Sequence, residues 1–250
     1  MKFIFTALVS ALVFAAQLAP SFGTEARRAK TVDDVRRAAC RVGVENARGT
    51  GSIIGLDDRL NKYLVLTNYH VVTSSRQATC EFWDESGKRS KTTGEIVWRA
   101  HDQNKPFDFA LIAIDRPFVE GLNLPYVPLA GEGARVFEGF AFDSAGCPRG
   151  QFVVGWDGGV VDVNRTTEFT PGPYPGQSGS AIVGFIDGKP WNIGILTWLV
   201  GQEGADDSRG AFIPVGNLWA ALGKKQRTSE QAPWRAPEGY RECPLIMKAR

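Results

Sequence analysis

An all-β fold, built as two six-stranded antiparallel β-barrels with a short C-terminal helix, is predicted by three observations in the sequence. The chain contains 28 glycines and 14 prolines, which is typical of a protein with many turns. Its apolar residues fall in short runs, separated by Gly, Asp, Asn and Ser, rather than in long helical periods. About six such runs precede residue 120 and about six follow it, a count that fits two similar barrels.

The first set of predicted strands begins at Cys40. Polar and apolar residues alternate directly after it, and the next run is rich in glycine. The predicted strands cover 41–44, 50–55, 63–67, 78–83, 95–98 and 109–114. We expect them to close a first barrel at about residues 40–120.

The second set is expected to form a barrel at about residues 125–223. Its predicted strands cover 135–142, 151–156, 159–163, 181–186, 191–199 and 210–215. Asp157-Gly158 and Asp187-Gly188 each separate two of these runs and are typical of tight hairpin turns. Leu218, Trp219 and Leu222 then recur at helical spacing, which predicts a short helix over 216–223.

Residues 1–23 have the pattern of a secretory signal peptide. Lys2 is their only charged residue, a mostly apolar run covers 3–16, and Ser21 and Gly23 are small residues near a cleavage site. The apolar run is too short to span a bilayer, which argues against a membrane anchor. We therefore predict a secreted or periplasmic protein with no membrane association after cleavage.

The segments on either side of the barrels carry little apolar periodicity. Residues 24–39 are interpreted as a charged N-terminal arm. Residues 224–250 hold seven Lys and Arg against three Glu, together with three prolines, so we expect a basic, solvated tail. The net charge of the whole chain is only +2, which argues against a nucleic-acid partner. The sequence carries no prediction of oligomeric state.

Four cysteines remain after the predicted cleavage, and an even number in an exported protein permits two disulfides in any of three pairings. We favour Cys40–Cys80 and Cys147–Cys243, because each bond would stay within a barrel or hold down the tail. The chain has no C-x-x-C motif and no paired histidines, so no metal site is predicted. No cofactor is expected.

The segment 175–180 (PGQSGS) predicts a nucleophile at Ser178. A serine hydroxyl needs a base to accept its proton and backbone N–H groups aimed at the developing oxyanion. The neighbouring glycines permit a tight loop, in which the N–H groups of Gly176 and Ser178 are expected to form an oxyanion hole. An α/β-hydrolase elbow does not fit, because Ser180 replaces the last glycine of that motif and a strand follows. Taken alone, the motif also fits a plain turn.

His70 is the predicted base. It lies where an apolar strand runs into a polar turn, a place where an imidazole can be held beside a core. The chain has one other histidine, His101, which lies in a polar loop and is expected at the surface.

Asp108 is the residue predicted to orient His70. It stands between two phenylalanines at the start of an apolar strand, where a buried carboxylate requires a partner. The alternatives are Asp102, in the polar loop, and Asp115, which follows the strand beside Arg116. Both are expected at the surface.

The order His70, Asp108, Ser178 is that of the chymotrypsin architecture and places the site between the barrels. The runs 66–72 (LTNYHVV), 108–112 (DFALI) and 175–180 (PGQSGS) resemble the triad motifs of bacterial trypsin-like serine peptidases. They are similar to those of glutamyl endopeptidases and of the protease domain of Do-like peptidases. The resemblance covers about residues 40–222. It implies a serine endopeptidase that cleaves protein or peptide substrates through an acyl-enzyme intermediate.

The alternative left open is a catalytically inactive module of the same fold that binds a protein partner in the cell envelope. Gln177 stands where animal trypsins have the aspartate that pairs with a newly cut N-terminus, so that activation is not expected. By resemblance, Gly172 lies at the base of the substrate pocket, with its walls formed by Leu196, Thr197, Trp198 and Ala211. None of these residues is charged, so we expect a small or apolar side chain before the cut bond.

Overall fold

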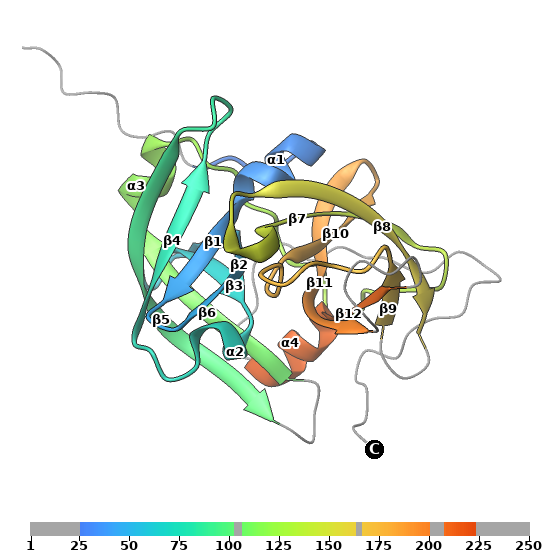
Figure 1. Ribbon diagram of the computed structural model, residues 1–250. Coiled ribbons are helices and arrows are strands. Elements are labelled where there is room, and N and C mark those ends of the chain that lie inside the picture. Colours follow the sequence, from blue (N-terminus) through green and yellow to red (C-terminus); the bar gives the residue numbers. More distant parts are fainter. Residues whose placement is uncertain (1–25, 103–106, 164–166, 201–207, 224–250) are drawn as a thin grey trace, which may run out of the picture.

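The structure is a computed structural model that describes residues 26–102, 107–163, 167–200 and 208–223 (Figure 1). The predicted signal peptide at 1–23, the basic tail at 224–250 and Cys243 lie outside the described residues. In the described ranges, no helix combines the length and the apolar character needed to cross a membrane.

Two closed six-stranded antiparallel barrels form the molecule, and they confirm the predicted fold class (Figure 1). The first has the strand order β1-β2-β3-β6-β5-β4 and the second the order β10-β11-β12-β9-β8-β7. The first barrel consists of β1 (Ala39–Val44), β2 (Ala47–Asp57), β3 (Lys62–Thr67), β4 (Gln77–Trp83), β5 (Arg89–Asp102) and β6 (Phe107–Asp115). The second consists of β7 (Ala141–Gly146), β8 (Val154–Asp162), β9 (Thr167–Thr170), β10 (Ala181–Ile186), β11 (Lys189–Val200) and β12 (Arg209–Pro214).

Each barrel is filled by its own side chains, as small closed barrels require. Branched residues such as Ile53, Val65 and Ile112 are fully buried in the first barrel. Aromatic rings fill the second, where Phe142 and Phe169 meet edge to face with their centroids 5.2 Å apart. Closure leaves neither of the two described sheets with a free edge.

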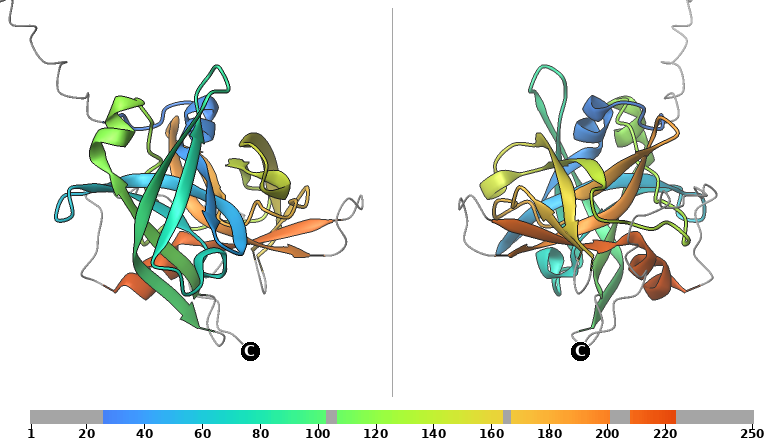
Figure 2. Two further views of the ribbon diagram at one scale, coloured as in Figure 1. Left: turned by 60° about the vertical axis from the view of Figure 1, so that its left-hand side comes forward. Right: turned by 90° about the vertical axis from the view of Figure 1, so that its right-hand side faces the viewer.

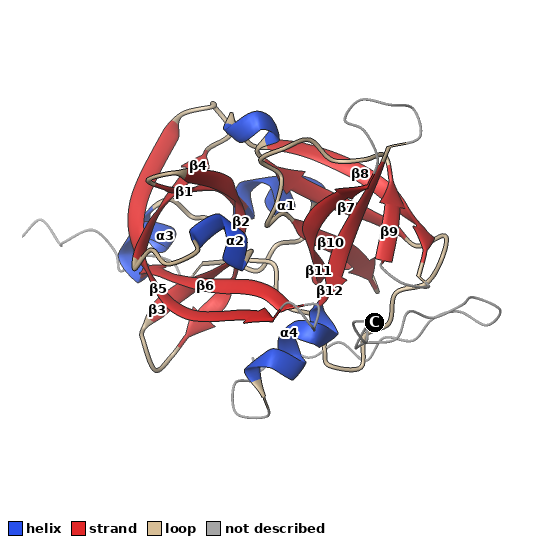
Figure 3. Ribbon diagram, turned by 60° about the horizontal axis from the view of Figure 1, so that its bottom comes forward, coloured by secondary structure: helices blue, strands red, loops and turns tan. Residues whose placement is uncertain are grey.

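Helix α4 (Val215–Leu222) confirms the predicted C-terminal helix, and it packs against β6, β11 and β12 (Figure 3). Three shorter elements were not predicted: α2 (Tyr69–Val72), α3 (Arg116–Gly121) and the 3-10 turn η1 (Pro148–Gly150). Each is a turn or two long, too short to show an apolar period.

The N-terminal arm is not irregular throughout, because it contains helix α1 (Val32–Ala38). Thr31 caps the helix, and the side chain of Asp34 accepts a hydrogen bond from the Thr31 backbone in return. Val35 and Ala38 are buried in an apolar cluster together with Val183 of β10. Helix α1 therefore packs where the two barrels meet (Figure 2).

Of the two predicted hairpin turns, only Asp187-Gly188 is a turn. Both of its residues have positive φ, at 51° and 70°, and they join β10 to β11. Asp157-Gly158 lies instead in the middle of β8, paired with Asp143 and Phe142 of β7. A Cβ at Gly158 would stand 2.7 Å from the Phe142 ring and 2.8 Å from the Thr170 carbonyl oxygen. The glycine is thus explained by close packing inside a strand.

The predicted Cys40–Cys80 disulfide is not present: Cys40, Cys80 and Cys147 are buried free thiols. In the β1–β4 register, Val42 faces Cys80, so Cys40 is its diagonal neighbour. The two thiols are close enough to interact, and burial, followed by the Cys80 thiol, raises the pKa of Cys40 well above its usual value, so Cys40 stays protonated. Burial raises the pKa of Cys147 to about 12, which keeps this thiol protonated at neutral pH.

Candidate active site

His70 and Asp108 are held together by two hydrogen bonds. The backbone N–H of His70, on α2, donates to Asp108 Oδ1 at 2.9 Å, and His70 Nδ1 lies 2.6 Å from Asp108 Oδ2. Asp108 is 7% exposed, so the ring nitrogen and the backbone N–H supply the partners that its buried carboxylate requires. Because both oxygens of Asp108 are used, the imidazole has one defined orientation, and its Nε2 edge is left for chemistry.

Asn68 connects this pair to the second barrel. Its side-chain amide donates to the Asp108 carbonyl oxygen at 2.9 Å and contacts Thr197 Oγ1 at 3.2 Å. Asn68 is fully buried, and Thr197 lies on β11. Thr197 was predicted as a pocket wall, and its hydroxyl accepts from Asn68 and donates to the Ile195 carbonyl oxygen.

The loop that carries Ser178 is fastened to the first barrel by Thr50. The Thr50 N–H donates to the Ser178 carbonyl oxygen at 2.7 Å, and its hydroxyl donates to the Gly176 carbonyl oxygen at 2.9 Å. The same hydroxyl accepts the Cys147 N–H at 2.9 Å. Sequence reasoning placed Thr50 only in a strand. Its partners lie about a hundred residues or more away along the chain, and no local pattern indicates them.

Two glycines let the His70 and Ser178 segments approach one another. Gly179 has φ +92°, and a Cβ there would lie 2.0 Å from the Thr50 carbonyl oxygen. A Cβ at Gly49 would lie 2.6 Å from the side chain of Val71, which follows His70, and 2.9 Å from the Ser178 carbonyl oxygen. The segments of all three residues predicted to carry the chemistry therefore meet between the barrels.

The N–H groups of Gly176 and Ser178 donate to no protein acceptor among the described residues. The preceding carbonyl, that of Pro175, accepts the Arg149 N–H of η1 at 2.5 Å and is thereby held toward that turn. Gly176 has φ +89°, the left-handed region that favours glycine.

The competing sequence candidates take no part in the hydrogen bonds between His70 and Asp108. The polar loop predicted for His101 and Asp102 is wrong, because both residues lie at the end of β5, where His101 faces Asp108 in the β5–β6 register. His101 is exposed and stacks on the Tyr69 ring, with centroids 4.6 Å apart. Asp115 is exposed and pairs with Lys62 at 3.1 Å, while Arg116 pairs with Glu120. In the ranges that the structure describes, no cluster of His, Cys, Asp or Glu is arranged to hold a metal ion.

The remaining residues predicted for the substrate pocket lie on β11, β12 and the loop before Ser178. Leu196 and Ala211 are each 1% exposed, whereas Trp198, paired with Ala211 in the register, is 41% exposed. A Cβ at Gly172 would stand 2.6 Å from Ser208 Oγ, so a neutral hydroxyl lies against that glycine.

Gln177 is buried within the nucleophile loop. Its side-chain oxygen accepts the Tyr174 N–H at 2.7 Å, and its carbonyl oxygen accepts the Ser180 hydroxyl at 2.7 Å. These bonds within the loop hold Gln177 in place without a charged partner.

Two antiparallel barrels, with a paired histidine and aspartate on one and a tight serine loop on the other, define the class of two-barrel serine peptidases. The chain belongs to the trypsin-like peptidase domain family, whose family model matches residues 49–190. It is a serine peptidase, a hydrolase that acts on protein or peptide substrates. No curated protein sequence matches it significantly.

Solved structures share the fold at low sequence identity. The Rv3671c protease of M. tuberculosis in its inactive form is 19% identical, with a TM-score of 0.55 over 76% of this chain and 90% of that one. A serine endoprotease from Yersinia pestis is 21% identical, with a TM-score of 0.56 over 78% of this chain and 66% of that one. The HtrA-type protease AlgW, solved with a decapeptide, is 19% identical, with a TM-score of 0.56 over 77% and 66%.

Proposed function

We propose that the protein is a serine endopeptidase in which Ser178 is the nucleophile, His70 the general base and Asp108 the residue that orients the base. The observation that carries this proposal is the double hydrogen bond between His70 and the buried Asp108 carboxylate. These bonds hold His70 in place. The next residue, Val71, packs against Gly49, and Gly49 in turn packs against the Ser178 carbonyl oxygen.

In this mechanism, His70 Nε2 accepts the proton of Ser178 Oγ while that oxygen attacks the carbonyl carbon of the substrate. The N–H groups of Gly176 and Ser178 stabilise the resulting oxyanion. His70 then gives its proton to the leaving amine as the C–N bond breaks, which leaves an acyl group on Ser178. Water attacks this ester with His70 again as base, releasing the acid and restoring the hydroxyl.

A fluorophosphonate probe is expected to label folded wild-type protein at Ser178, because this reagent reacts with a serine hydroxyl that a base has activated. Mass spectrometry of the labelled peptide checks the site. Ser178→Ala should abolish the label, and Ser74→Ala, which removes an exposed serine four residues from His70, should leave it unchanged. Folded wild-type protein without an adduct would instead favour the inactive, partner-binding module.

We further propose that the enzyme prefers a small or apolar side chain immediately before the cut bond. The residues that support this preference are the buried Leu196 and Ala211 and the neutral Ser208 against Gly172. A substrate pocket that lacks a residue of opposite charge disfavours an ionised substrate side chain. Profiling kcat/KM with a peptide library should give the highest values for Ala, Val or Leu at that position. A dominant preference for Arg, Lys or Glu would contradict the proposal.

A further inference from the structure

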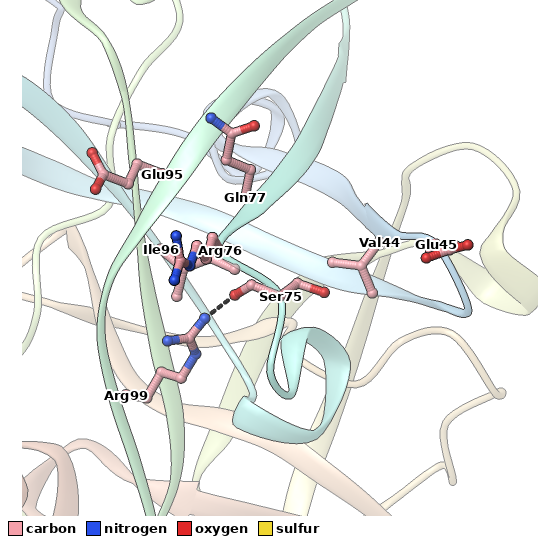
Figure 4. Close-up of a pocket in the computed structure, with 8 residues that line it drawn as sticks. All are labelled: Val44, Glu45, Ser75, Arg76, Gln77, Glu95, Ile96 and Arg99. Carbon is pink, nitrogen blue, oxygen red and sulfur yellow. Dashed lines mark hydrogen bonds between the residues drawn. The ribbon is translucent and has the colours of Figure 1, made fainter.

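A cavity of about 620 Å³ opens on the first barrel, outside the residues assigned to catalysis (Figure 4). It lies between the turn after β1, the segment that follows α2, and β5. Six of its eight lining residues are polar, and four of them are charged. The lining residues are Val44, Glu45, Ser75, Arg76, Gln77, Glu95, Ile96 and Arg99.

The two arginines of this cavity have no carboxylate partner among the described residues. The guanidinium of Arg99 donates to the carbonyl oxygen of Ser75, a neutral acceptor that holds the group in place and leaves its charge uncompensated. The Arg99 Nε atom is buried without a hydrogen-bond partner. Arg76 is exposed and forms no ion pair in the described part of the chain. In Figure 4, Glu45 and Glu95 stand on opposite sides of the two arginines.

Two guanidinium groups in one cavity, of which Arg99 is held by the Ser75 carbonyl and Arg76 is exposed, favour an anion. Two like charges in one cavity repel each other, and a carboxylate placed between them replaces that repulsion with two attractions. Arginine presents a planar fork of donors that matches a carboxylate, and Arg99 is already held by the Ser75 carbonyl, so little side-chain entropy is lost on binding. Glu45 and Glu95 also line the cavity, but both are exposed, so water screens their charge.

If the proposed mechanism holds, the cavity lies on the side of the site from which the leaving group departs. His70 gives its proton to the leaving amine, so the substrate segment after the cut bond passes over α2. Ser75 lies three residues after the end of that helix, and its N–H donates to the Val72 carbonyl oxygen. On the other wall, Glu45 lies in the turn before β2, four positions before Gly49, which packs against Ser178; that path is at most about 13 Å. An extended peptide covers this distance in about four residues.

We propose that this cavity binds a carboxylate of the substrate, carried by the segment about three to five residues beyond the cut bond. The inference rests on the proposed function. The carboxylate belongs either to an Asp or Glu side chain or to the C-terminus of the substrate chain, and the same two arginines would hold it in both cases.

The test uses internally quenched peptides that are identical around the cut bond. A single Glu, Gln or Lys is moved from the first to the sixth position beyond it, and a second series ends at each position in a free acid or an amide. We expect kcat/KM to be about five- to tenfold higher for Glu than for Gln near the fourth position, with Lys below Gln. This advantage should shrink in 0.5 M salt. Preference for the free acid in the second series would identify a terminal carboxylate as the ligand.

Arg76→Gln and Arg99→Gln should each remove most of the preference for Glu, by lowering kcat/KM for the Glu peptide toward that for the Gln peptide. Arg99→Lys retains the positive charge, so this variant should keep more of the preference for Glu than Arg99→Gln does. This comparison distinguishes an effect of the charge from an effect on folding. Lys91→Gln is the matched control, because Lys91 is an exposed cation on the same strand outside the cavity. An active wild-type enzyme that cleaves the Glu and Gln peptides equally at all six positions would overturn this inference. An enzyme that cleaves no peptide at all would overturn the proposed function instead.

Discussion

Ser178→Ala is expected to reduce kcat/KM on the order of 10⁶-fold, and His70→Ala by a similar factor, because the two residues act as one unit. The double variant should be no slower than either single one. Asp108→Asn should cost about 10⁴-fold, since an amide cannot accept both N–H groups of His70 and so fails to hold the imidazole in its reactive tautomer.

Steady-state hydrolysis of one internally quenched peptide measures these effects, and near-ultraviolet circular dichroism confirms that each variant is folded. Ser74→Ala serves again as the control and should keep wild-type turnover. If Ser178→Ala retained more than a small fraction of wild-type kcat/KM with a native spectrum, Ser178 would not be the nucleophile.

Gly179→Ala should destabilise the whole molecule and remove activity together. Two costs combine at this position. The backbone at φ +92° disfavours any side chain by about 1–2 kcal/mol. The added methyl would also overlap the Thr50 carbonyl and the Thr67 hydroxyl, which adds about 1–3 kcal/mol of overpacking. We expect the free energy of unfolding to fall by about 3 kcal/mol or more.

Gly188→Ala is the matched control, because Gly188 also has positive φ, at 70°, but open space around its Cα. It should lose only the backbone cost of about 1–2 kcal/mol and keep full activity. Urea unfolding followed by tryptophan fluorescence measures both variants. Equal stability losses for the two would show that the contacts of Gly179 with Thr50 and Thr67 are unimportant.

The two Asp-Gly pairs show what the sequence could and could not predict about the fold. Asp187-Gly188 and Asp157-Gly158 have the same letters and similar β-rich neighbours, and only the first is a turn. The difference depends on Phe142, a residue of another strand whose ring occupies the space above Gly158. The spacing of apolar residues and the residue types typical of turns predicted the barrels. A glycine that is required because a ring from another strand lies against it cannot be recognised from its sequence neighbours.

The same distinction applies to the candidate site. His70 and Asp108 could be singled out because each interrupts an apolar strand context with a titratable group. Thr50 could not, since a threonine in a strand is unremarkable and its role depends on hydrogen bonds to Gly176 and Cys147. Helix α1 was missed for another reason: it spans only seven residues, and the partners of its apolar face include residues far along the chain.

Helix α1 has a consequence for the order of events during synthesis. The ribosome makes this helix before any strand, yet part of its packing surface, including Val183, comes from the second barrel. A nascent chain that has emerged through residue 120 holds all six strands of the first barrel, but Val35 and Ala38 still lack those neighbours, and Thr50 lacks the Ser178 and Gly176 carbonyls. Final closure therefore waits for β10, and the site proposed around Ser178 cannot assemble on a half-made chain.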